Sequence, residues 1–112
     1  LCVPKASGKY PAILKVPGAG IRAYNGEAER AGKGFIILEI GIHGIPVNME
    51  GDVYHRLYNG ALKNYHSFNM DNRDKYYYKR VYTGCVRAIE FIYTLPVIWR
   101  PLEEARAVRF PL

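Results

Sequence analysis

Two apolar runs in the first half of the chain predict β-strands. The first extends from Tyr10 to Val16 and ends at Pro17-Gly18-Ala19-Gly20, which is typical of the turn after a strand. The second, Phe35 to Ile40, is apolar at nearly every position and has Glu39 as its only charge. Because strands buried on both faces lack a polar alternation, this run indicates a parallel sheet that is covered on both sides.

Helix-forming residues lie between and after these strands. The segment Tyr24 to Lys33 contains several good helix formers and stops at glycines, so one short helix is predicted there. The next stretch, Gly41 to Asn72, has no clear period and is rich in Gly, Asn, Pro, His and Tyr. It predicts a long excursion with a helical turn near Asp52 to Leu57, and such loops often carry functional residues.

The strongest helical pattern precedes Pro96. Its apolar residues recur at steps of three and four, and the helix is expected to follow cap candidates between Asp71 and Asp74. A thiol on its apolar face behaves as a small hydrophobe, so Cys85 is predicted to be buried and inert. Strands alternating with helices predict an α/β layered sheet with right-handed crossovers. The expected apolar face of the helix comprises Tyr78, Val81, Tyr82, Cys85, Ile89 and Ile92.

The last segment, residues 97–112, differs from the rest. It contains the only tryptophan, Trp99, together with three arginines and two glutamates. One turn of helix is expected from Leu102 to Val108, but the segment does not continue the alternation of strands and helices. The chain is therefore divided into residues 1–96 and a distinct tail, residues 97–112.

Composition narrows the function classes. The chain has 112 residues, enough for a single domain or part of one. Its formal net charge of +6 permits an acidic partner without requiring one. No apolar run is long enough to span a bilayer, and no signal segment is recognisable. Cys2 and Cys85 form no CxxC pair, so a disulfide scaffold is excluded. Because the chain begins at Leu1 within an expected strand, we expect a fragment.

Three blocks in order connect these elements to a known family. They are Tyr10 to Gly20, Gly34 to Pro46, and Tyr76 to Ala88, the last ending in an Arg-Ala pair. Together they resemble acetyl xylan esterases and cephalosporin deacetylases, which are α/β-hydrolases, over residues 1–96. The resemblance implies the N-terminal part of a truncated α/β-hydrolase fold, with a mostly parallel sheet and flanking helices. It also implies an ester hydrolase that needs no metal or organic cofactor, and it favours an exported protein.

The first block carries the site that the resemblance implies. In the family, the main-chain N–H after the first glycine of a His-Gly-Tyr-Gly turn helps to bind the oxyanion, and Pro17-Gly18-Ala19-Gly20 occupies that place here. Ala19 is therefore the expected oxyanion donor, while Gly18 and Gly20 are expected to let substrate approach closely. Loss of the tyrosine ring is expected to widen the acyl pocket. His43 stands where the family often has Arg, so an ion pair made by that Arg is not carried over.

The catalytic triad of the family is expected to lie outside this chain. Family members carry a Gly-Gly-Ser-Gln-Gly-Gly nucleophile elbow, followed by Asp and His, after the helix that ends here at Pro96. The serines of this chain, Ser7 and Ser67, lie in no Gly-x-Ser-x-Gly setting. The parent is thus expected to deacetylate acetylated carbohydrate by a Ser-His-Asp acyl-enzyme route, and this chain alone to be inactive.

Other residues leave alternative functions open. His43, His55 and His66 are evenly spaced, but their long loop spacings do not match a zinc site, and hydrogen-bonded or surface loop histidines are the simpler interpretation. The rings and cations from Tyr76 to Arg80 suit single-stranded nucleic acid, yet core rings beside a solvated basic face explain them more simply, so nucleic acid is not an expected partner. The aromatic rings from Tyr54 through Tyr58 and Tyr65 to Phe68 suit sugar stacking. The alternative function is therefore a small basic module that binds carbohydrate or nucleic acid.

Overall fold

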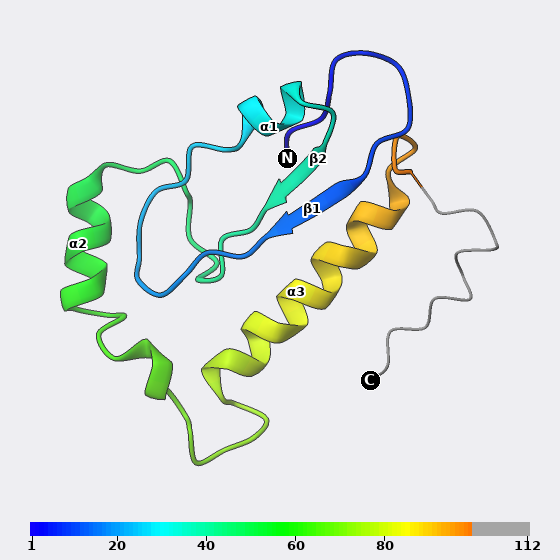
Figure 1. The fold of residues 1–112 in the computed structure, drawn as a ribbon. Coiled ribbons are helices and arrows are strands. Elements are labelled where there is room, and N and C mark those ends of the chain that lie inside the picture. Colours follow the sequence, from blue (N-terminus) through cyan, green and yellow to red (C-terminus); the bar gives the residue numbers. More distant parts are fainter. Residues whose placement is uncertain (100–112) are drawn as a thin grey trace.

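The computed structural model describes residues 1–99, which form a small sheet and the helices around it (Figure 1). The elements follow in the order β1 (Ala12–Lys15), α1 (Ala28–Gly32), β2 (Ile36–Glu39), α2 (Gly51–Asn59), the 3-10 helix η1 (Tyr65–Ser67) and α3 (Tyr77–Thr94). The alternation of strands and helices confirms the α/β class. Within residues 1–99, no helix has the length and apolarity needed to cross a membrane. The expected turn from Leu102 to Val108 lies outside the described residues.

The sheet is centred on two parallel strands. β1 and β2 pair in parallel over their whole length. One further bridge lies at each side, because Cys2 pairs antiparallel with Ile37 of β2, and Ile98 pairs parallel with Tyr10, just before β1. The order across the sheet is therefore Cys2, β2, β1, Ile98. Both predicted strands are confirmed, and β1 ends before Pro17, which has no N–H to donate to a neighbouring strand.

A single bridge extends the sheet beyond Pro96, where the sequence pattern predicts no further alternation of helix and strand. The N–H of Tyr10 donates to the carbonyl of Val97 at 2.8 Å, and the N–H of Trp99 donates to the carbonyl of Tyr10 at 2.8 Å. Residues 97–99 therefore join the sheet after α3. The run is too short, before Arg100-Pro101, to give a periodic signal in the sequence. The division of the chain at residue 96 remains a prediction.

Two helices differ in length from the prediction. α1 is confined to the second half of the expected segment 24–33, because Gly26, with a φ of 78°, interrupts helical geometry just before it. α2 is longer than the expected turn: it ends at Asn59, and Gly60 is its C-cap. An ion pair between Arg56 and Asp52, at 3.1 Å with a spacing of four residues, supports the exposed side of α2.

α3 begins later than its cap candidates suggest. Its first helical residue is Tyr77, and Tyr76 occupies the N-cap position without a capping side chain. Within the candidate segment, the side-chain oxygen of Asn72 accepts the N–H groups of Asp74 and Lys75 at 3.0 and 3.2 Å. The polar residues 71–74 therefore organise the turn that leads into α3 and do not cap it.

The buried face of α3 is narrower than predicted. Val81 and Ile92 are buried and Cys85 is partly buried, but Tyr82 is 66% exposed and Ile89 is 46% exposed. The sheet formed by residues 1–99 covers only one ridge of the helix, so the second half of the predicted apolar face stays open. The expected apolar face is therefore covered only in part, and Cys85, which was expected to be buried, is half-buried.

The core lies between the sheet and α3. Its buried centre is formed by Ile36, Ile92 and Ile98, with partly buried apolar residues of β1 and β2 around it. Ile36 and Ile37 are neighbours in β2 and are 0% and 1% exposed. Because successive strand residues face opposite sides, β2 is covered on both faces, as predicted. α1 contacts β2 and α3 contacts β1, and the two helices lie on either side of the strands (Figure 1).

Candidate functional site

The loop after β1 leaves the sheet where the strand order reverses. From β1 the chain moves to β2 on one side, and it later returns to Ile98 on the other side of β1. In open α/β sheets, ligands bind outside the carboxyl ends of the strands at such a reversal. The loop at residues 16–20, which contains Gly18, Ala19 and Gly20, therefore occupies the position expected of a ligand site.

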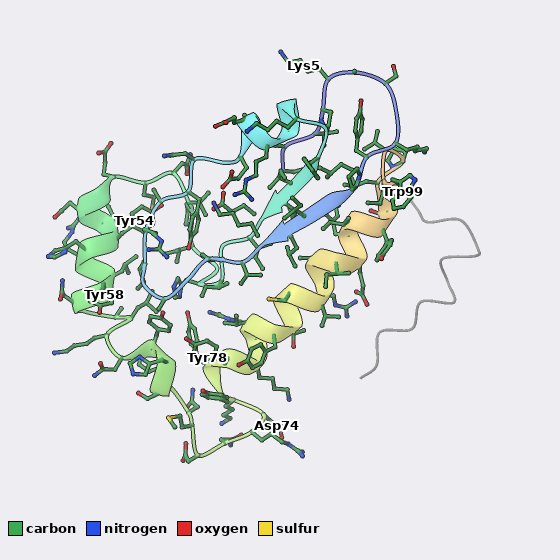
Figure 2. All side chains as sticks on the ribbon, in the orientation of Figure 1. Lys5, Tyr54, Tyr58, Asp74, Tyr78 and Trp99 are labelled. Carbon is green, nitrogen blue, oxygen red and sulfur yellow. The ribbon has the colours of Figure 1, made fainter. Side chains whose placement is uncertain are left out.

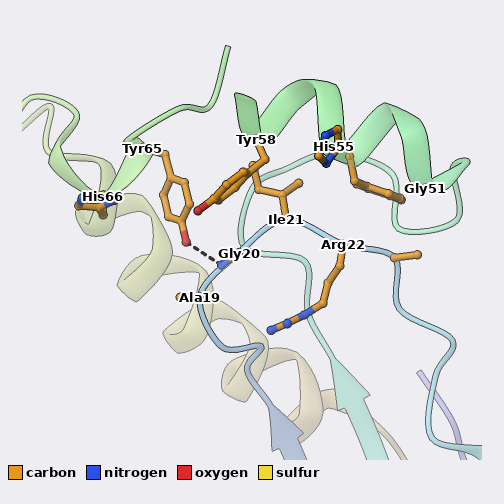
Figure 3. Close-up of a pocket in the computed structure, with 11 residues that line it drawn as sticks. Ala19, Gly20, Ile21, Arg22, Gly51, His55, Tyr58, Tyr65 and His66 are labelled. Carbon is orange, nitrogen blue, oxygen red and sulfur yellow. Dashed lines mark hydrogen bonds between the residues drawn. The ribbon is translucent and has the colours of Figure 1, made fainter. Parts of the chain in front are cut away.

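A cavity of about 590 Å³ opens beside this loop (Figure 3). Its wall is made by residues 19–23, by one side of α2 and by η1, and none of the residues 1–99 that line it is Asp or Glu. The aromatic part of the wall comes from Tyr54 and Tyr58 of α2, which Figure 2 also shows, and from Tyr65 of η1. The volume falls within the range of about 300–1,000 Å³ that is usual for small-molecule sites.

Both main-chain groups of Gly20 are held by side chains from other elements. Its N–H donates to the hydroxyl of Tyr65 at 3.1 Å, and its carbonyl oxygen lies 3.0 Å from Nε2 of His43. The φ of Gly20 is +107°, a conformation that side-chain-bearing residues rarely adopt. These contacts fix the backbone at the end of the candidate oxyanion loop, and a glycine is required there.

His43 is buried and both its ring nitrogens are engaged. Nδ1 lies 2.6 Å from the hydroxyl of Tyr77, and a carbonyl can only accept, so Nε2 carries the proton shared with Gly20. In the neutral ring, Nδ1 then accepts from Tyr77, and burial raises the pKa of the Tyr77 hydroxyl although the nearby Arg80 lowers it. Arg80 lies over the Tyr77 ring at 5.1 Å and donates to the His43 carbonyl. His43 is thus a positioning residue, as the hydrogen-bonded interpretation of the loop histidines predicted.

Ion pairs hold Lys15, the residue that precedes the loop. Lys15, at the end of β1, contacts the carboxylate of Glu27 and lies 3.3 Å from that of Glu39. The hydrogen bond with Glu27 raises the pKa of Lys15, and the same bond lowers the pKa of Glu27. Because the Lys15 side chain is partly exposed to solvent, which screens its charge, these pairs contribute little to stability, but they fix the direction in which the chain leaves β1.

The structure separates the three predicted site residues. Ala19 and Gly20 line the cavity, whereas Gly18 lines a neighbouring hollow. Within residues 1–99, no group accepts the N–H of Ala19, so this donor is available to a ligand, while that of Gly20 is already used by Tyr65. A Cβ added at Gly18 would meet only the Arg22 guanidinium at 3.4 Å, an ordinary contact. The role of Gly18 in substrate approach remains a prediction.

The described residues contain no serine paired with a histidine. Ser67 Oγ donates to the carbonyl of Asn64 at 2.9 Å, and Ser7 is exposed near the start of β1. His55 and His66 lie exposed at the rim of the cavity. In the same part of the chain, no three His, Cys, Asp or Glu side chains are grouped as metal ligands would be. The chemistry that residues 1–99 offer is therefore donation of a main-chain N–H beside an aromatic cavity.

The side chains that hold the loop are not evident from the sequence. Tyr65 is expected there only as a possible sugar-stacking ring, and no role is expected for the hydroxyl of Tyr77. The contacts that they make span 45 residues, from Tyr65 to Gly20, and 34 residues, from Tyr77 to His43. No local pattern signals contacts between segments so far apart in the chain.

Replacing Tyr65 by phenylalanine tests whether its hydrogen bond to Gly20 holds the loop in place. Tyr65→Phe removes the acceptor of the Gly20 N–H, and we expect faster hydrogen exchange at that amide and a loss of about 1 kcal/mol in stability. Tyr58→Phe is the matched control, because the Tyr58 hydroxyl has no hydrogen-bond partner within residues 1–99. Equal exchange at Gly20 in the wild type and Tyr65→Phe would show that this hydrogen bond does not hold the loop.

Comparison with known proteins relates the chain to an esterase. It is similar to acetyl esterase Axe7A of Xylanibacter ruminicola, with 40% identity over 105 residues. The match covers 86% of this chain but only 23% of that protein, so the chain spans a small part of the length of its relative. No protein-family model matches the chain, and no solved structure matches it. The esterase relationship agrees with the resemblance drawn from the three sequence blocks.

Proposed function

We propose that this chain forms the oxyanion-binding side of an acetyl ester hydrolase with an α/β-hydrolase fold. In the complete protein, a Ser-His-Asp triad outside residues 1–112 removes acetyl groups from acetylated carbohydrate. The similarity to an acetyl esterase supports the ester class of the substrate. The observation that carries the proposal is the available N–H of Ala19, on a loop held through Gly20 and facing a cavity.

The proposed contribution of Ala19 to catalysis is electrostatic stabilisation by its main-chain N–H. When a serine oxygen attacks the acetyl carbonyl, the C=O π bond opens and the carbonyl oxygen becomes an oxyanion. A main-chain N–H aimed at that oxygen stabilises the tetrahedral intermediate more than the planar ester. In hydrolases with a nucleophile elbow, one such donor comes from a strand-to-helix loop and the other from the residue after the nucleophile. Ala19, after β1, supplies the first donor.

The sheet order supports an α/β-hydrolase fold. The run 97–99 continues the sheet beside β1, opposite β2, and starts at the end of α3. A parallel neighbour on each side of β1 suits the open, doubly wound sheet of an α/β-hydrolase.

His43 does not serve as the general base in this proposal. Its two ring nitrogens contact Gly20 and Tyr77, and no serine lies against it among residues 1–99. A general base must reach the proton that it removes. His43 instead fixes the loop that presents Ala19, which is a positioning role.

Turnover of a simple acetyl ester tests the proposed function. The complete protein, as its gene encodes it, is expected to hydrolyse 4-nitrophenyl acetate with saturation and to be labelled at one serine by a fluorophosphonate. Residues 1–112 alone are expected to give no turnover above a heat-killed control, because they lack a serine placed by a base. Saturable hydrolysis by residues 1–112 that survives Ser7→Ala and Ser67→Ala would overturn the assignment of the triad. Absence of hydrolysis by the complete protein would overturn the esterase proposal itself.

A further inference from the structure

Three tyrosines line the cavity, and two of them have structural tasks. Tyr54 is 3% exposed, and its hydroxyl donates to the carbonyl of Pro46 at 2.6 Å and accepts the N–H of Met49 at 3.0 Å. Tyr65 is 4% exposed and holds Gly20. Their rings and hydroxyls are committed to the fold, so neither is free to adapt to a ligand.

Tyr58 is different in every one of these respects. It is 52% exposed, and within residues 1–99 neither its ring nor its hydroxyl has a partner. It lies one turn after Tyr54 on α2, and Figure 3 shows its ring reaching from α2 toward Tyr65 and Gly20. An aromatic ring that lines a cavity without stabilising the fold is available to a ligand.

We propose that the Tyr58 ring is the platform on which the sugar of an acetylated carbohydrate stacks, and that it sets the preference for sugar acetates over ring-free acetates. The proposal rests on the proposed function, because it takes the N–H of Ala19 as the acetyl-binding end of the same cavity. A pyranose ring seated on Tyr58 has its acetyl group directed toward Ala19.

The chemistry of the wall fits a neutral sugar ring. A pyranose has an apolar face of C–H groups, which packs on an aromatic ring, and a rim of hydroxyls that need hydrogen-bond partners. His55, His66 and Arg22 provide polar groups around the cavity, and the part of the chain that the structure describes adds no carboxylate to its wall. The side chain at position 19 is a methyl group, so the loop leaves room for a ring beside the acetyl group.

The experiment compares two acetates in the complete protein. Tyr58→Ala is expected to lower kcat/KM for methyl 2-O-acetyl-β-D-xylopyranoside by about tenfold, since it removes one stacking face. Hydrolysis of ethyl acetate, which has no ring, should change by less than about twofold. Tyr58→Trp should restore kcat/KM for the sugar acetate, because tryptophan also provides a flat ring. Tyr82→Ala, at an exposed tyrosine of α3 away from the cavity, is the matched control and should change neither substrate.

The outcomes separate this inference from the proposed function. If Tyr58→Ala slows both acetates equally, or neither, the stacking role is wrong while the esterase stands. If the complete wild-type protein hydrolyses no acetate, the esterase proposal fails. Calorimetric binding of the same xyloside then tests whether Tyr58 is a stacking platform. Tighter binding to the wild type than to Tyr58→Ala would still support the platform, and equal binding or none would overturn it.

Discussion

Ala19→Pro is expected to lower kcat of the complete protein on 4-nitrophenyl acetate by about 100-fold to 1,000-fold, the usual effect of removing one oxyanion donor. Proline has no N–H, so the substitution deletes the donor itself. The hydrogen bonds that Gly20 makes with Tyr65 and His43 do not involve the N–H of Ala19, so they can still form in the variant. The effect should appear in kcat more than in KM, because the oxyanion exists only in the transition state and the intermediate.

Ala19→Ser is the matched control for this substitution. It keeps the N–H and adds only one oxygen to an exposed side chain, so kcat should remain within about threefold of the wild type. Circular dichroism and the unfolding midpoint of Ala19→Pro show whether the fold is retained. A folded Ala19→Pro protein with wild-type kcat would exclude Ala19 as an oxyanion donor.

Ile36→Ala is expected to have the largest effect on stability, a loss of about 2–5 kcal/mol in the free energy of unfolding. Ile36 is fully buried in β2 and meets Ile92 of α3 and Ile98 in the core, so the cavity left behind touches three separate elements. Small domains have total stabilities of about 5–15 kcal/mol, so this loss is a large fraction of the whole. Urea unfolding of the complete protein, followed by hydrogen exchange at Ile37, measures it.

The control for the core is Val86→Ala on the open side of α3. Val86 is 57% exposed, so truncating it should change the free energy of unfolding by less than about 0.5 kcal/mol. If Ile36→Ala does not accumulate in soluble form while Val86→Ala does, the same ranking is obtained from yield and protease resistance. Equal effects of the two substitutions would show that the core is not centred on Ile36.

The strands could be predicted because their signal is local. The apolar run that includes Ile36 and Ile37 has no alternation, and the structure buries both faces of β2 for that reason. The turn after β1 could be located from its Pro and Gly residues. The pairing of Ile98 with Tyr10 could not, because a bridge between residues so far apart depends on how α3 returns the chain to the sheet.

The predicted face of α3 was right in period and wrong in width. Periodicity identifies which residues share a side of a helix, but the neighbouring elements decide how much of that side is covered. Val81 and Ile92 are both buried, and Ile92 packs in the core with Ile36, whereas Tyr82 and Ile89 lie on the adjoining ridge and are open to solvent. The width of the buried face of a helix therefore depends on tertiary packing, and the sequence pattern alone does not determine it.

The candidate site could be predicted only in part for a similar reason. The loop carrying Ala19 was identified through a family resemblance, and the structure gives it an available N–H beside a cavity. The side chains that hold the loop come from η1, from α3 and from the segment after β2. His43 takes both Gly20 and Tyr77 as partners, an arrangement that depends on three distant segments meeting.

The most direct test of the account is the crystal structure of the complete protein after reaction with an acetyl-like phosphonate, in which the phosphonyl oxygen stands for the oxyanion. We predict that this oxygen accepts the main-chain N–H of Ala19 at about 2.7–3.1 Å, with Gly20 still bound to Tyr65 and His43. A phosphonyl oxygen held by other donors, with the N–H of Ala19 turned away from it, would contradict the central claim.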